Sequence, residues 1–330
     1  MQAVTEPGLR PWPGGLVTYF YTYVQPAPCI FDIRIEFAAR DRGEWAMFVA
    51  HPADRLNVAR ALAAPLVLFS PFWCSFFEQY LLISAVAIFV LIGDTNYILH
   101  LHIHRPFSTR PWLNLLLDLG MGFTTGMTAS NWRIQHRYGH HRGIDVPYRP
   151  GREWETARYS ALGALSFSTR SIWPTFWQPV AESFDKGVLS NAPGPISYRW
   201  AFAEQFLFAL FVAALLVWRP RLVLTFLLPW YALIYFISRY VDYLNHYGCD
   251  ERSANPYERA NNSLSRLFNR SCNNFGYHTA HHMRPSAHWT ELPAIHARIR
   301  DRIPERLLKS FSWSCLLLPY HCVLSWLGRV

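Results

Sequence analysis

The sequence predicts an all-α integral-membrane protein in which two helical hairpins, with four transmembrane helices, carry a helical cap on one side of the membrane. Hydrophobic residues make up 51% of the 330 residues and gather in two long blocks. The mean hydropathy of the whole chain is only +0.04, so a large polar part must lie outside the bilayer. Clustered histidines follow the apolar blocks, which places the polar chemistry of the chain in that cap.

The first apolar block, 58–100, is too long for one crossing of ~30 Å of hydrocarbon at ~1.5 Å rise per residue. Pro71 and the polar pair Glu78-Gln79 offer a turn inside the block. The block therefore predicts a transmembrane hairpin with spans at roughly 60–77 and 79–99.

The second apolar block, 201–239, predicts a second hairpin that turns at residues 218–221. Each hairpin returns the chain to its starting side. The three polar segments 1–57, 101–200 and 240–330 are therefore expected on one face, as an N-terminal segment and the two parts of the cap.

Two shorter apolar stretches are predicted to lie at the membrane surface. The stretch from Leu115 to Ala129 is rich in Gly and Thr and suits a re-entrant or interfacial helix. The stretch from Phe311 to Trp326 is expected to be an amphipathic C-terminal anchor.

The net charge of +9 comes from arginines scattered between the apolar blocks, which favours anionic lipid, or an acidic redox or acyl-carrier protein, over nucleic acid as the partner of this positive charge. Lys and Arg are dense in the three polar segments, so the positive-inside rule places the cap on the cytoplasmic side of the cell inner membrane. Arg219 and Arg221, in the opposite turn, count against this orientation. The six cysteines form no pair typical of a zinc ribbon and no disulfide framework.

Nine of the fourteen histidines lie just beyond predicted spans, in three clusters and one isolated position. These nine metal-ligand candidates are His100 and His104; His136, His140 and His141; His278, His281 and His282; and the isolated His246. The other five, His51, His102, His288, His296 and His321, are interpreted as surface or hydrogen-bonded residues.

Spacing within the clusters suits metal binding. On a helix His100 and His104 are about 40° apart on one face, while His102 points away. His136 and His140 repeat this spacing, and the adjacent His141 can turn to a neighbouring metal. The third cluster does the same with an i,i+3 pair, His278 and His281.

Nine imidazoles exceed the four to six ligands that one ion takes, so two metal ions are predicted. Imidazole suits iron, zinc and copper alike, and the element stays open from ligand type alone. Asp94 lies within the second predicted span, where a carboxylate is by default functional. It either orients His100 or His104 or pairs with another group inside the bundle.

The order and spacing of these clusters resemble the membrane fatty acid desaturase and hydroxylase superfamily, with its H-x(3,4)-H, H-x(2,3)-H-H and H-x(2)-H-H boxes. Residues 273–282, followed by His288-Trp289 and Leu292-Pro293, look like the third box of its bacterial branch. That branch includes desaturases, alkane hydroxylases and fatty acid decarboxylases that form 1-alkenes. Residues 242–248 are similar to the N-Y-x-x-H-Y-G element of alkane hydroxylases, but Asp242 stands where the family often has Asn.

The resemblance implies two iron ions, O₂ as oxidant, and a fatty acyl or alkyl chain in a narrow tunnel between cap and membrane. Asp242 is then a possible iron ligand, directly or through water. The chain has no Cys₄ site and no flavin or nucleotide glycine motif, so the resemblance also implies a separate ferredoxin or rubredoxin with its reductase.

Several reactions are compatible with this resemblance. Desaturation ranks first, and terminal oxidation by hydroxylation or by decarboxylation to a 1-alkene is the alternative. Chain length, the carbon oxidised, and a free acid or an ester as substrate stay open. A membrane metal transporter or zinc-dependent membrane hydrolase is the alternative of a different class, although a transporter would hold its ligands near the bilayer midplane.

Overall fold

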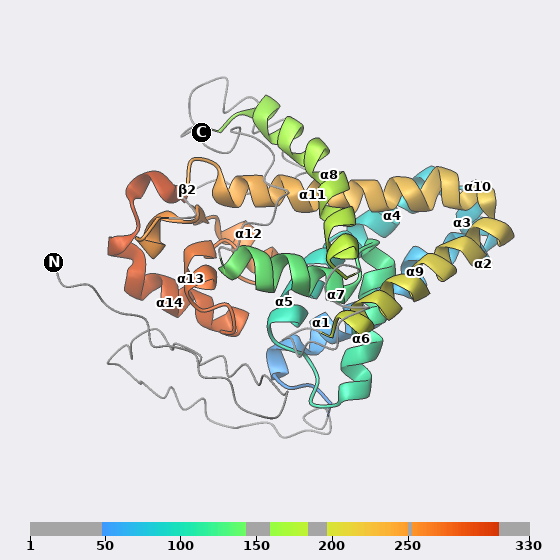
Figure 1. Cartoon of the computed structure of the whole chain (residues 1–330), viewed down its shortest axis with the longest axis horizontal. Helices are drawn as coiled ribbons and strands as arrows, with labels where there is room; N and C mark the ends of the chain where they lie inside the picture. The colour runs from blue at the N-terminus through green and yellow to red at the C-terminus, as the bar shows by residue number, and fades with distance from the viewer. Residues whose placement is uncertain (1–47, 143–158, 184–196, 250–252, 310–330) are drawn as a thin grey trace, which may run out of the picture. The chain divides into compact units, whose positions relative to one another are not determined.

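Helices form almost all of the regular structure in the computed structural model, which describes residues 48–142, 159–183, 197–249 and 253–309 (Figure 1). These residues belong to one unit of the chain, 43–330. The predicted anchor at 311–326 lies outside the described residues. The α-helices are α1 (Arg55–Leu68), α2 (Ser70–Trp73), α3 (Ser75–Gln79), α4 (Leu81–Ile92), α5 (Thr95–His104), α6 (Pro111–Thr125), α7 (Ala129–Trp132), α8 (Ala161–Ser183), α9 (Tyr198–Trp218), α10 (Pro220–Leu222), α11 (Leu228–His246), α12 (Arg266–Ser271), α13 (His278–Met283) and α14 (Leu292–Ile299).

Short 3₁₀ and π-helical segments and one small sheet complete the fold. The sheet pairs β1 (Asn262–Ser263) with β2 (Leu308–Lys309) in parallel. The short helical segments are η2 (Pro52–Asp54), η3 (Arg133–Gly139), η4 (His140–Arg142), η7 (Val223–Leu227), η8 (Pro256–Glu258), η9 (Trp289–Glu291), η10 (Arg300–Arg302) and η11 (Glu305–Leu307).

Three helices of the described chain are long and apolar enough to cross a membrane: Leu81–His104, Tyr198–Trp218 and Pro220–His246. Their outer faces expose large apolar side chains, such as Leu82 at 80% and Val217 at 87% exposed. Exposed aliphatic surface on this scale is expected where lipid replaces water.

The predicted first span, 60–77, is not one continuous helix, so the described residues hold three candidate spans and not four. The chain divides there into α1, α2 and α3. Proline explains the first break, because Pro71 has no N–H to donate to Val67, and Ser70 Oγ donates to that carbonyl instead at 2.8 Å. The hairpin itself is present, since the apolar core packs α1 and α2 against α4.

The turns of both hairpins lie together, because Arg219 Nη1 in the second turn is 3.2 Å from Glu78 Oε2 in the first. This pairing compensates one of the two arginines that counted against the predicted orientation. The other ends of the long helices carry histidines: the first span ends at His104 and the third at His246. At ~1.5 Å per residue these spans exceed ~30 Å, so their last turns extend past the hydrocarbon.

Helix α6 replaces the interfacial helix predicted at 115–129, beginning and ending four residues earlier. It ends at Gly126, whose φ of +77° and close approach to the Tyr231 ring exclude a side chain. Trp230, Tyr231 and Tyr235 of α11 donate hydrogen bonds to the carbonyls of Thr124, Phe123 and Gly126. These bonds satisfy terminal carbonyls that have no partner within the helix, and they fix α6 to α11.

Helix α8 packs along α11 and has no counterpart in the sequence prediction. Its buried stripe consists of small residues, Ala164, Ser168, Ser171 and Thr175, each at most 1% exposed. Small side chains at this spacing let two helices approach closely. Ser168 Oγ donates to Ala164 O within the same helix, so its hydroxyl can be buried without another partner. A search for apolar periodicity overlooks a buried face made of such polar residues.

Candidate metal centre

The first histidine cluster occupies the last turn and a half of α5, and the helix sorts its members as predicted. His100 and His104 are buried on the face that meets the other clusters. His102 points away: its Nδ1 accepts the backbone N–H of Phe107 at 3.2 Å, and its Nε2 lies 3.3 Å from Asp118. His102 is therefore a buried structural residue.

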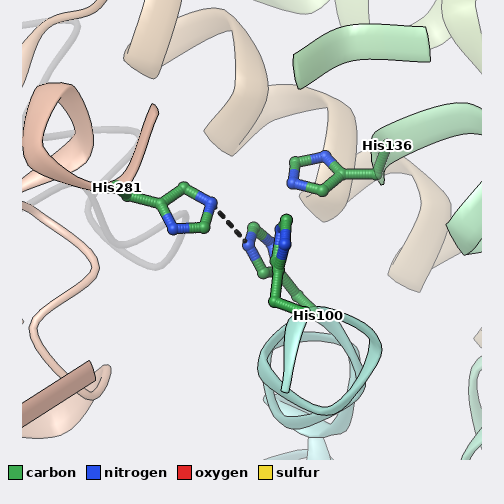
Figure 2. A group of neighbouring side chains, drawn as sticks. His100, His136 and His281 are labelled. Atoms are coloured by element: carbon green, nitrogen blue, oxygen red, sulfur yellow. Dashed lines mark hydrogen bonds between the residues drawn. The ribbon is translucent and has the colours of Figure 1, made fainter. Parts of the chain in front are cut away.

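One group of four buried histidines combines three elements: His100 and His104 of α5, His136 of η3 and His281 of α13. Their ligand atoms all lie within 4.8 Å of one another. The Nε2 atoms of His100 and His281 are 3.1 Å apart, and Figure 2 shows the rings of His100, His136 and His281 pointing toward one another. His104 Nε2 is buried with no hydrogen-bond partner among the described residues.

A second group of four comprises His140, His246, His278 and His282, with ligand atoms again within 4.8 Å. Nε2 of His278 lies 3.2 Å from that of His246 and 3.1 Å from that of His282. His246 Nδ1 lies 3.0 Å from the carbonyl of Arg259. Donation of a proton to that carbonyl leaves His246 Nε2 as a lone pair aimed at the group.

His141 joins the two groups. Its Nε2 lies 3.0 Å from His136 Nε2 and 3.1 Å from His281 Nε2, and its ring centroid is 4.6 Å from that of His282, with the two rings tilted by 40°. The structure thus brings all nine predicted histidines into two adjacent groups.

The division of the second and third clusters between the groups differs from the prediction. His136 shares a group with His141, and His140 belongs to the other, because residues 133–139 form a π-helix in which i and i+5 align. In α13 the pair on one face is His278 and His282, and His281 turns to the opposite group.

The histidines outside the spans are held neutral. Burial lowers the pKa of His140 and of His281 to about 3. Burial also holds the pKa of His136, His141, His278 and His282 well below the usual 6.5. Neutral imidazoles present lone pairs, which is the form that binds a metal ion.

The nitrogen separations fit metal ions. Two nitrogens bound to one ion at about 2.1 Å lie roughly 3.0 to 3.4 Å apart, in octahedral or tetrahedral geometry. The Nε2 pairs of both groups are 3.0 to 3.2 Å apart. Facing lone pairs at this distance repel unless a proton or a cation lies between them, and neutral rings have too few protons for every pair.

Two carboxylates stabilise the segment that carries the second histidine cluster. Asp118 of α6 binds Arg133 Nη2 with both oxygens, at 2.8 and 2.9 Å. Glu204 of α9, only 1% exposed, accepts the backbone N–H groups of Ala129 and Ser130 at the start of α7. Sequence reasoning missed Glu204, although a carboxylate inside an apolar block is the same signal that singled out Asp94.

Replacing Glu204 by leucine is expected to destabilise the protein and loosen the second cluster. The change leaves two buried N–H groups unsatisfied, at about 1–3 kcal/mol each. We expect a lower melting temperature and less bound metal, with Glu204→Gln in between because it keeps one acceptor. The half-exposed Glu78→Gln is the control, since a surface ion pair contributes at most about 1 kcal/mol; an equal loss in that control would contradict a specific role for Glu204.

Asp94 forms an ion pair with Arg60 of α1, and not with His100 or His104. Of the two predicted roles, pairing with another group inside the bundle is the one observed. Asp242 lies at the second group: Oδ2 is 2.7 Å from Arg239 Nη2, and Oδ1 is 4.0 Å from His246 Nε2. That separation is wider than those between the histidine nitrogens. Direct or water-mediated metal binding by Asp242 stays a prediction.

A third, separate group contains His51, Asp54 and His288. Asp54 receives hydrogen bonds from His288 Nε2 at 3.0 Å and from Trp289 Nε1 at 2.8 Å, and His51 stacks on the His288 ring. Both Asp54 oxygens accept hydrogen bonds from residues at η9, so this group connects η2 to η9 and has a structural role. His296 is buried beside the Tyr277 ring, and neither of its ring nitrogens has a hydrogen-bond partner in the described part of the chain. His321 lies outside that part.

A family model described as fatty acid desaturase matches residues 75–313. The chain belongs to the fatty acid desaturase family. The matched range contains the three candidate spans and all nine histidines of the two groups, and it confirms the resemblance predicted from the sequence. Desaturase-family members are oxidoreductases that use iron, and membership together with the apolar helices identifies this one as a membrane protein. No curated protein and no solved structure matches the chain.

Proposed function

We propose that this desaturase-family protein catalyses O₂-dependent oxidation of an unactivated C–H bond in a fatty acyl chain, with desaturation as the reaction. The observation that carries the proposal is the pair of adjacent groups of buried, converging imidazoles at the ends of two membrane helices. A site at the end of a span is within reach of a hydrocarbon chain that lies in the bilayer.

Each group of histidines would hold one iron ion. His100, His104, His136, His141 and His281 would hold one, and His140, His246, His278 and His282 the other, with Asp242 beside the second. Bound iron would supply the binding and reduction of O₂ and the removal of hydrogen from carbon. Burial keeps the imidazoles outside the spans neutral, in the form that binds metal.

The reaction balances with two electrons from outside. O₂, two electrons and two protons, together with two hydrogens from neighbouring carbons, form two water molecules and leave a C=C double bond. The three cysteines of the described chain, Cys74, Cys249 and Cys272, form no metal-binding group. We therefore propose a separate ferredoxin or rubredoxin with its reductase, which meets the site on the cytoplasmic side of the cell inner membrane.

The alternative class, a transporter or a zinc-dependent hydrolase, fits the geometry less well. Transport sites lie near the middle of the bilayer, whereas His104 and His246 are the last residues of their spans. A catalytic zinc ion takes three protein ligands and keeps one position open, and nine histidines exceed that need. Terminal oxidation, by hydroxylation or by decarboxylation, is the second candidate. Polar side chains such as Gln135 and Arg239 line a cavity beside the histidines and favour decarboxylation, in which the carboxyl end reacts.

Metal and product analysis test this proposal together. We expect two irons per chain in the purified protein, and an oxidised acyl chain when fatty acids, ferredoxin, reductase and O₂ are supplied. An alkene with the original carbon number identifies desaturation, and one with a carbon fewer identifies decarboxylation. A protein that contains one zinc and no iron would overturn the oxidase proposal.

A further inference from the structure

A narrow cavity reaches both histidine groups. It is bordered by His100 and His136 of the first group and by His140 and His278 of the second. Six of the other ten wall residues are polar, and Tyr97, Trp132, Val241 and Phe275 make up the rest. The polar side chains in this wall are Asn96, Gln135, Ser238, Arg239, Asp242 and Asn245.

An alkyl chain is a poor occupant of the polar part of this cavity. Polar groups covered by hydrocarbon lose their water without gaining a hydrogen bond, which costs free energy at each group. Sites for apolar chains are therefore lined mainly by apolar side chains, with a few polar groups where the ligand is polar. The wall composition indicates that the polar end of the substrate, and not its middle, lies next to the histidines.

Arg239 is the cationic group of this wall. It lies seven residues before His246 on α11, so both residues and Asp242 share one helix face. The guanidinium is 2.7 Å from Asp242 and lies over the Phe167 ring at 5.2 Å, and the side chain is 6% exposed. These contacts orient the planar fork, which is the geometry that binds carboxylates with two parallel hydrogen bonds.

Two amide side chains in the cavity wall give independent evidence of a bound ligand. Gln135 and Asn245 are 4% and 2% exposed, and within the described chain each has a buried side-chain oxygen with no hydrogen-bond partner. Buried polar atoms without partners are rare in native proteins. Because an amide can turn over and present N–H in the same place, both can donate to a carboxylate in the cavity.

We propose that Arg239 binds the carboxylate of a free fatty acid, with Gln135 and Asn245 as further donors. The proposal rests on the proposed function and specifies its substrate class. Asp242 links the two sites, at 2.7 Å from Arg239 and 4.0 Å from His246 Nε2. A carboxylate at Arg239 therefore brings the first few carbons of the chain to the histidine groups, and oxidation is expected near the carboxyl end.

Equilibrium binding of hexadecanoate and 1-hexadecanol to the iron-loaded protein in detergent, without reductant, tests the substrate class. Arg239→Gln is expected to weaken hexadecanoate binding by about 30-fold and to leave hexadecanol binding unchanged. Arg239→Lys keeps the charge but not the fork, and an intermediate loss is expected. The exposed Arg298→Gln is the control and should bind both ligands as the wild type does.

The variant Asp242→Asn distinguishes two roles of Arg239: binding the substrate carboxylate, or holding Asp242 in position. It removes the competing anion, so hexadecanoate should bind at least as tightly as to the wild type. Equal losses for both ligands in Arg239→Gln, or a matching loss of hexadecanoate binding in Asp242→Asn, would overturn the proposal. Melting temperature and iron content exclude misfolding as the cause.

Product analysis distinguishes this inference from the proposed function. Oxidation within the first few carbons of hexadecanoate supports it, whereas a double bond in the middle of the chain overturns it and leaves the desaturase function intact. Conversely, Arg239-dependent binding of hexadecanoate without any oxidation under O₂ and reductant would reject the proposed function and retain the binding site.

Discussion

Replacing His281 by alanine is expected to abolish turnover and to lower the iron content of the purified protein. His281 Nε2 lies 3.1 Å from both His100 Nε2 and His141 Nε2, so its loss removes a proposed iron ligand where α5, α13 and the second cluster meet. With one ligand gone, we expect a loss of more than about 100-fold in iron affinity or activity, beyond the 10–100-fold typical of changes to groups that merely orient ligands. Iron analysis and single-turnover oxidation of a fatty acid measure the two effects.

The matched test of the second group is His140→Ala, because His140 Nε2 lies 3.1 Å from His282 Nε2. His296→Leu is the control: this buried histidine of α14 belongs to neither group, and it should keep its iron and its activity. Unchanged activity and iron content in both His140→Ala and His281→Ala would refute the assignment of the metal centre.

Acidification below about pH 6.5 is expected to release the metal and to destabilise the metal-free protein. The histidines of an unfolded chain bind protons near pH 6.5, whereas burial lowers the pKa of folded His281 to about 3. Between these values the unfolded state binds more protons, so stability is highest above pH 6.5 and falls as the pH drops toward 3. At about pH 5, His281 alone accounts for about 2 kcal/mol.

Melting temperatures of the metal-free protein in detergent between about pH 8 and pH 4.5 measure this effect. His281→Gln is the control, because it removes one buried titrating group and should flatten the pH dependence. A melting temperature that stays constant through this range would contradict burial of the imidazoles in their neutral form.

Most of the correct predictions came from two patterns in the sequence, the hydrophobic blocks and the spacing of the histidines. Long apolar runs identify membrane helices because spanning requires about 20 apolar residues, a local property of the sequence. Local spacing likewise placed His100 and His104 on one face of α5 and His102 on the other. The same method overlooked α8, whose buried stripe of Ser, Thr and Ala carries no apolar period.

The sequence by itself determined the family, the apolar membrane helices and the nine histidines that converge, since all of these follow from composition and spacing along the chain. Only the tertiary structure decided how the histidines divide between two groups and which polar side chains line the cavity beside them. The physical reason is that these features depend on contacts between distant segments. The π-helical turn at 133–139 sends His140 and His141 to different groups, and the fold places Arg239 of α11 in one cavity with His100 of α5 and His136 of η3.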